Sequence, residues 1–282
     1  MPSNRALAAL VLVFVLGGCS TLAPVLNLLI SRSGYHVEEN LAYGSDPRQT
    51  LDVYVPDHPA GRKPVILFFY GGSWQSGRKE TYLAFGESFA TKDIVVAIAD
   101  YRVYPQVRYP DFVRDGAAAF AYVRAHIAQY GGDPDRIFLC GHSAGAYIAV
   151  MLAADPHYLD DAGAKLSQVR GVIGLAGPYD FLPLTDPALI TIFGGARREE
   201  TQPIRYIDGK RPPMLLAAGD ADTTVSPGNT TRLAAKLRSF GSPVEEHIYP
   251  GIGHAGIILS LAPLLRGNTT LRDDMIAFVN KN

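Results

Sequence analysis

Short apolar runs recur along the chain at intervals that suit buried strands. Most are continuously apolar rather than alternating, a pattern typical of strands that are covered by helices on both faces. The runs predict strands at residues 51–55, 65–70, 94–99, 137–140, 169–176, 214–218 and 244–249.

Amphipathic stretches between these runs predict helices. Pro110 suits the first turn of a helix and Gly131-Gly132 suits its end, so we expect a helix from Pro110 to about Tyr130. The other expected helices cover residues 80–92, 144–154, 227–240 and 268–279. This alternation predicts one α/β domain, with a mostly parallel sheet and helices on both faces.

The first residues of the chain follow a different pattern. One positive charge, Arg5, precedes the continuously apolar residues 6–16, and small residues close the segment. This arrangement predicts a secretory signal peptide over residues 1–18, because the apolar stretch is too short to span a membrane.

The end of this segment, Leu16-Gly17-Gly18-Cys19, resembles a bacterial lipobox, in which the cysteine is acylated. The resemblance implies a lipid on Cys19. Residues 19–34 are then expected to form a tether between the lipid and the α/β domain, which covers residues 35–282. We therefore expect an exported lipoprotein, anchored to a membrane of the bacterial cell envelope and facing the periplasm or the surface. The alternative is an uncleaved or ordinary signal with an incidental cysteine.

Composition narrows the range of partners. The chain has 282 residues, with 26 Lys and Arg against 27 Asp and Glu, so no basic excess exists for binding nucleic acid. Cys140, the second of two cysteines, lies in an apolar run and is expected to be buried rather than disulfide-bonded.

The most informative motif is Gly141-His142-Ser143-Ala144-Gly145, which follows a predicted strand and opens a predicted helix. In that context the motif indicates a nucleophile elbow with Ser143 at its tip. The positive end of the following helix dipole would favour negative charge that develops beside this serine. The alternative is a structural glycine turn.

A second glycine motif, Tyr70-Gly71-Gly72-Ser73-Trp74, follows an earlier strand. A loop at this place in α/β-hydrolases contributes an N–H to the oxyanion hole, together with the residue after the nucleophile. We therefore expect oxyanion donors at Gly72, Ser73 and Ala144. Without Ser143 the motif would indicate only a turn.

Two acids and a histidine follow the last two strands. Ser143 needs a base, for which His254 is the candidate, and His254 needs a carboxylate that fixes its tautomer. Asp222 is favoured over Asp220, which lies nearer the strand end and suits bracing of the loop. The remaining histidines lack metal-ligand spacing, so neither a metal nor another cofactor is expected.

Together these motifs resemble the α/β-hydrolase carboxylesterases of the hormone-sensitive-lipase and feruloyl-esterase-like (BD-FAE-like) group, over about residues 40–280. The most specific stretches are Asp100-Tyr101-Arg102 and the run Tyr130-Gly131-Gly132-Asp133-Pro134 before the elbow. The resemblance implies an α/β-hydrolase fold and the trio Ser143, Asp222 and His254. One position departs from the family: Tyr70 stands where a histidine usually braces the oxyanion loop.

The expected function is hydrolysis of a small-molecule carboxylic ester through an acyl-enzyme, without a cofactor. An amide hydrolase, similar to kynurenine formamidase or prolyl oligopeptidase, would use the same trio, and a non-catalytic binding protein is the more distant alternative. Residues 178–211 interrupt the strand–helix rhythm with several prolines. They are expected to form a loop with short helices that either roofs the acyl pocket through Tyr179, Phe181 and Leu182 or is merely packed. Trp74 is a candidate for the pocket wall.

Overall fold

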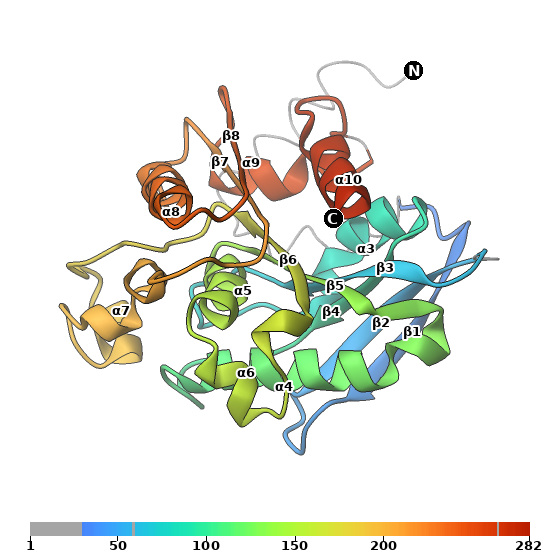
Figure 1. The fold of residues 1–282 in the computed structure, drawn as a ribbon, viewed down its shortest axis with the longest axis horizontal. Coiled ribbons are helices and arrows are strands. Elements are labelled where there is room, and N and C mark those ends of the chain that lie inside the picture. Colours follow the sequence, from blue (N-terminus) through green and yellow to red (C-terminus); the bar gives the residue numbers. More distant parts are fainter. Residues whose placement is uncertain (1–29, 58–59, 264) are drawn as a thin grey trace, which may run out of the picture.

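The computed structural model describes residues 30–57, 60–263 and 265–282. An eight-stranded sheet forms its centre, in the order β1-β2-β4-β3-β5-β6-β7-β8 (Figure 1). The strands are β1 (Tyr35–Ala42), β2 (Thr50–Pro56), β3 (Lys63–Phe69), β4 (Val95–Ala99), β5 (Gly132–His142), β6 (Val169–Leu175), β7 (Met214–Gly219) and β8 (Val244–Tyr249). The predicted signal peptide, Cys19 and most of the predicted tether lie outside the described residues.

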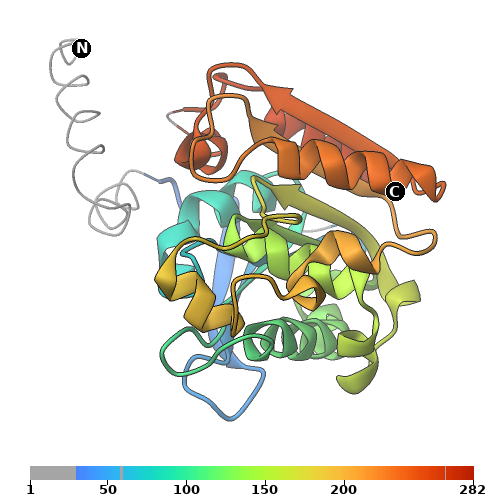
Figure 2. The same cartoon turned by 90° about the vertical axis from the view of Figure 1, so that its left-hand side faces the viewer.

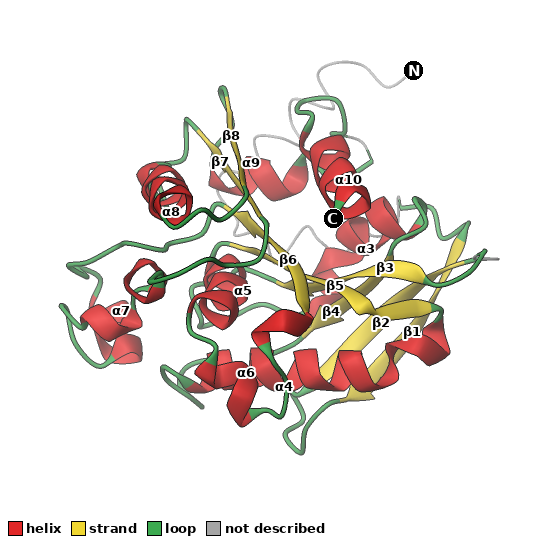
Figure 3. Cartoon of the chain, viewed as in Figure 1, coloured by secondary structure: helices red, strands yellow, loops and turns green. Residues whose placement is uncertain are grey.

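Helices cover both faces of the sheet, with α4, α5 and α6 on one side and α3 and α10 on the other (Figures 1 and 3). The α-helices are α3 (Leu83–Ala90), α4 (Asp111–His126), α5 (Ala144–Ala154), α6 (His157–Asp161), α7 (Pro187–Phe193), α8 (Gly228–Ser239), α9 (His254–Leu259) and α10 (Leu271–Lys281). Short 3₁₀ helices are η1 (Lys79–Tyr82), η2 (Ile127–Tyr130), η3 (Leu166–Gln168), η4 (Glu199–Thr201) and η5 (Pro203–Tyr206).

Six neighbouring strands of the sheet are parallel, in the order β4, β3, β5, β6, β7 and β8. Strands β1 and β2 extend the sheet beyond β4 through antiparallel pairs. The two central strands, β3 and β5, are buried on both faces over Val65–Phe69 and Ile137–Cys140. Their ladder ends with Phe69 opposite Gly141, so the loop after β3 and the loop after β5 emerge side by side. The predicted α/β-hydrolase fold, with its mostly parallel sheet, is confirmed.

Two local predictions differ from the structure. Strand β1 carries no continuous apolar run, because it lies at the edge of the sheet and exposes most of its side chains, so its pattern did not predict a strand. The helix that was expected to reach Tyr130 ends as an α-helix at His126 and tightens into the 3₁₀ turn η2. Gly131 then closes this turn with φ 76°, a left-handed conformation that suits glycine.

The connection from β6 to β7 makes the predicted excursion. It carries α7, η4 and η5, and it projects at one end of the molecule beyond α5 (Figures 1 and 2). Asp186 begins α7 by accepting hydrogen bonds from the backbone N–H groups of Ala188 and Leu189. Within the described part of the chain, no helix is long and apolar enough to cross a membrane.

Candidate active site

The predicted elbow is a sharp turn between β5 and α5. Ser143 has φ 54° and ψ −121°, a strained conformation that persists only where the surrounding structure imposes it. A Cβ on Gly145 would lie 2.0 Å from the carbonyl oxygen of Phe69, and one on Gly141 would lie 2.2 Å from the carbonyl oxygen of Gly145. Both glycines therefore allow the elbow to press against its own helix and the end of β3.

The structure joins the three predicted trio residues in one hydrogen-bonded chain. His254 begins α9, and its Nε2 lies 2.8 Å from Ser143 Oγ. Its Nδ1 lies 2.8 Å from Asp222 Oδ2. The Asp222 side chain is fully buried, whereas that of His254 is 18% exposed, so a substrate can approach the base from solvent while the acid stays shielded.

The hydrogen bonds of Asp222 and Asp220 show which of the two acids faces His254. The second oxygen of Asp222 accepts hydrogen bonds from the backbone N–H groups of Thr224 and Val225, both at 2.9 Å. These bonds aim the carboxylate at His254. Asp220 instead accepts the N–H of Gly251 at 2.6 Å and joins the two loops, which is the bracing role expected for it.

The glycine loop after β3 lies against the elbow. A Cβ on Gly71 would be 3.0 Å from the Cβ of Ser143. Gly72 has φ 134°, which only glycine adopts readily, and Ser73 and Trp74 have φ 52° and 58°, each of which costs a non-glycine residue about 1–3 kcal/mol. Among the described residues, none accepts a hydrogen bond from the N–H of Gly72, Ser73 or Ala144, the three predicted oxyanion donors.

His142 is a site residue whose role sequence reasoning left open. It is buried, its Nε2 lies 3.1 Å from the backbone oxygen of His254, and its ring centroid lies 5.0 Å from that of His254. Because a carbonyl oxygen only accepts, Nε2 carries the proton. Burial, and secondarily the nearby His254, lowers the pKa of His142 to about 3, so the ring stays neutral. Its place inside the elbow motif was the only signal in the sequence.

An aromatic cluster flanks the site on the side of the β6–β7 connection. The Trp74 ring packs edge-on against Tyr147 and Phe193, at 5.2 and 4.8 Å, and stacks on Phe181 at 6.2 Å. Trp74 and Phe181 therefore belong to one apolar cluster. Tyr179 is fully buried with its hydroxyl against Gly174, so it is packed as a connecting segment would be and does not roof a pocket.

Cys140 is free and fully buried, as expected, and burial raises the pKa of its thiol. No group of three or more His, Cys, Asp or Glu side chains in the described ranges is arranged to hold a metal ion.

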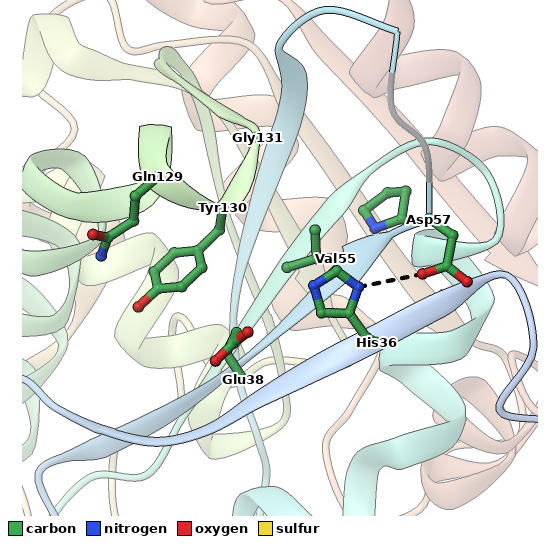
Figure 4. A pocket seen from close by; sticks show the side chains of 8 residues that line it. His36, Glu38, Val55, Asp57, Gln129, Tyr130 and Gly131 are labelled. Atoms are coloured by element: carbon green, nitrogen blue, oxygen red, sulfur yellow. Dashed lines mark hydrogen bonds and ion pairs between the residues drawn. The ribbon is translucent and has the colours of Figure 1, made fainter.

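A surface pocket of about 520 Å³ lies at the opposite edge of the sheet from the trio, where β5 begins (Figure 4). His36 and Asp57 pair across one of its sides at 3.2 Å. Both side chains are largely exposed, and the pocket is separated from Ser143 by the length of β5.

Comparison with known proteins identifies the family of this chain. The BD-FAE family model matches residues 51–237, a stretch that includes the glycine loop, the elbow and Asp222. The chain belongs to the BD-FAE family. The match covers more than half of the chain and confirms the resemblance expected from the motifs.

Several curated relatives are named esterases. A probable isoprenylcysteine α-carbonyl methylesterase of Arabidopsis thaliana is 30% identical over 86% of this chain and 56% of its own length. The esterase LipC of Mycobacterium tuberculosis is 29% identical over 82% of this chain and 62% of its own length. This BD-FAE member thus spans little more than half the length of such relatives.

Solved structures agree on the fold. A truncated carbohydrate esterase from gut microbiota superposes with a TM-score of 0.77 at 23% identity, covering 89% of this chain and 98% of the other. Esterase 2 of Thermogutta terrifontis, phosphonylated by sarin, superposes with a TM-score of 0.74 at 26% identity, covering 90% and 96%.

Proposed function

We propose that this BD-FAE member is a serine carboxylesterase that acts on small-molecule esters through an acyl-enzyme. The observation that carries the proposal is the hydrogen-bonded chain from Asp222 through His254 to Ser143, with the serine held at a strained elbow. Family relatives that are named methylesterases and esterases support ester chemistry.

In this mechanism Ser143 Oγ attacks the ester carbonyl while its proton passes to His254 Nε2. The buried Asp222 carboxylate stabilises the imidazolium that forms and keeps its Nδ1 proton oriented. The oxyanion binds in the hole formed by the backbone N–H groups of Gly72, Ser73 and Ala144, where one such donor typically contributes about a hundredfold to a thousandfold to turnover.

The tetrahedral intermediate then collapses and expels the alcohol, which takes the proton from His254. Water attacks the acyl-enzyme by the same route: His254 accepts its proton, the oxyanion forms again, and Ser143 leaves with the proton returned. Apart from the ester and the attacking water, these steps use only groups of the chain.

The direct test is Ser143→Ala. We expect the turnover of p-nitrophenyl acetate to fall by at least about a thousandfold, since the trio acts as a unit. A fluorophosphonate probe should label the wild-type chain on the peptide that contains Ser143 and leave the variant unlabelled. Residual activity near that of the wild type would refute the assignment.

A substrate panel addresses the leaving group. Acetyl and longer acyl esters are compared with N-formylkynurenine and proline-containing peptides at equal enzyme concentration. Faster Ser143-dependent turnover of the esters supports the proposal, whereas preference for either amide substrate would make the chain an amide hydrolase.

We also propose that the chain is an exported lipoprotein, anchored through a lipid on Cys19. The support is the signal-like pattern of residues 1–18 together with the lipobox-like ending. In a bacterial host, Cys19→Ala should move the protein from the membrane fraction to the soluble fraction after lysis. An unchanged distribution between the two fractions would contradict anchoring through this residue.

A further inference from the structure

The hydroxyl of Tyr70 lies in a buried network at the start of the glycine loop. The side chain is fully buried, and its ring stacks on Tyr82 at 5.6 Å and on Tyr101 at 4.9 Å. The hydroxyl donates to Asp100 Oδ1 at 2.6 Å and accepts from Arg48 Nη2 at 2.9 Å. A single phenol thus bridges a carboxylate and a guanidinium.

The same two charged groups hold the far end of the loop. Arg48 Nη2 also donates to the carbonyl oxygen of Gly77 at 2.8 Å, and Asp100 Oδ1 also accepts the backbone N–H of Lys79 at 2.9 Å. Residues 71–78 are therefore fastened at both ends to one pair of side chains, with the Tyr70 hydroxyl between them.

The loop also folds back onto the tyrosine ring. Gly77 has φ 114°, and a Cβ there would lie 2.5 Å from Cε2 of Tyr70, so glycine permits the close return. The Tyr70 carbonyl oxygen accepts the hydroxyl of Tyr101 at 2.8 Å. Ring, hydroxyl and backbone of Tyr70 are each fixed by a separate contact.

The middle of the loop needs such fixing. Ser73 and Trp74 both have left-handed φ values, which non-glycine residues hold only where the surrounding structure imposes them. Trp74 is held by the aromatic cluster, and its carbonyl oxygen accepts the N–H of Tyr104 at 2.8 Å. Gly72 and Ser73 lie between this point and Tyr70, so the two attachments together determine where their N–H groups face.

We propose that Tyr70 is a positioning residue for the oxyanion hole, acting through the hydrogen-bonded chain Arg48–Tyr70–Asp100 rather than by touching substrate. This inference rests on the proposed esterase function. Tyr70 stays protonated at working pH and can keep donating to Asp100, because burial, reinforced by Asp100, raises the pKa of the phenol.

The test uses Tyr70→Phe in the full chain, which removes the hydroxyl and leaves the stacked ring. We expect kcat for p-nitrophenyl acetate to fall about tenfold to a hundredfold, less than the loss of a whole donor, with KM within about twofold. Inhibition by a phenylboronic acid, whose tetrahedral serine adduct places an oxygen in the oxyanion hole, should weaken by a similar factor. Tyr35→Phe is the control, because it deletes the hydroxyl of another buried tyrosine, on the edge strand β1, whose hydroxyl donates to the backbone oxygen of Ser31.

The outcomes separate this inference from the proposed function. If the wild-type chain hydrolyses the ester in a Ser143-dependent way and Tyr70→Phe keeps kcat within twofold, the bracing role is overturned and the esterase stands. A rise in KM with unchanged kcat also overturns it. A wild-type chain without Ser143-dependent turnover overturns both.

A second variant covers a failure of Tyr70→Phe to fold. Arg48 is partly exposed, and Arg48→Met keeps an unbranched apolar stem while removing the bonds of the guanidinium to the tyrosine hydroxyl, to Gly77 and to the Tyr101 carbonyl oxygen. The expected result is again a lower kcat, at unchanged KM, in protein whose thermal unfolding remains cooperative. Activity within twofold of wild type would overturn the proposal.

Discussion

Replacing Asp222 with asparagine tests the hydrogen-bond arrangement of the trio, because the structure determines which way the new amide must face. Asp222 Oδ1 accepts two backbone N–H groups, those of Thr224 and Val225, while Oδ2 faces His254 Nδ1. An asparagine has one acceptor and one donor end. Its oxygen must meet the two N–H groups, since an NH₂ there would leave three donors facing one another.

The amide nitrogen of the variant then points at His254 Nδ1. To accept this bond, Nδ1 must be unprotonated, so the neutral ring carries its proton on Nε2. That proton faces Ser143, and the ring no longer accepts the serine proton. A forced wrong tautomer of this kind lowers kcat by about 10⁴ in serine proteases, equivalent to about 5 kcal/mol of transition-state stabilisation.

The assay is kcat and KM for p-nitrophenyl acetate, with thermal unfolding measured in parallel. We expect Asp222→Asn to lose about 10³–10⁴ in kcat at nearly constant KM, since the trio does not bind the ground state. The control is Asp220→Asn, which changes the acid bonded to Gly251 and should keep kcat within tenfold. If Asp222→Asn kept more than a tenth of the activity while Asp220→Asn abolished it, Asp222 would not be the acid that orients His254.

Two further substitutions test other parts of the site. Gly145→Ala would place a Cβ 2.0 Å from the backbone oxygen of Phe69, so we expect a loss of at least about 3 kcal/mol of stability in thermal unfolding; an unchanged melting temperature would contradict this close contact. His142 stays neutral in the native state because burial lowers its pKa to about 3, whereas the unfolded chain protonates it below about pH 6.5. Native stability should therefore fall as pH drops from about 6.5 toward 3, by about 1.4 kcal/mol per pH unit from this group. The free energy of unfolding is measured in urea at pH 7 and at pH 5. Between these pH values His142→Gln should lose about 2 kcal/mol less of it than the wild type, and an equal loss in both proteins would rule out the buried neutral ring.

The central sheet could be predicted from the sequence because burial on both faces leaves continuous apolar runs. The runs predicted at 65–70 and 137–140 coincide with the buried parts of β3 and β5, whereas the polar first half of β5, from Gly132, was not predicted as strand. Strand β1 could not be predicted in this way, since it is held by backbone pairing with β2 while most of its side chains face solvent. Helices α7 and α9, of seven and six residues, are too short to show a helical period.

The chemistry of the candidate site was predictable where it depends on local geometry. The elbow has a fixed spacing, and its strand before and helix after are visible in the sequence. The bond between Asp222 and His254 joins loops that emerge from neighbouring strands, and the distance of each acid from its strand end favoured Asp222 over Asp220. The partners of Tyr70 lie 22 and 30 positions away, at Arg48 and Asp100, in loops whose meeting only the folded chain reveals.

The ladder between β3 and β5 has a consequence for how the protein tolerates mutation. The register that sets Phe69 opposite Gly141 is made of backbone hydrogen bonds, and it places the glycine loop beside the elbow regardless of which side chains fill the core. Core substitutions that weaken packing away from the glycine loop and the elbow should therefore reduce the fraction of molecules that are folded, while each folded molecule keeps its turnover rate. At those positions the interior can accept substitutions until the free energy of unfolding becomes too small to keep the protein folded.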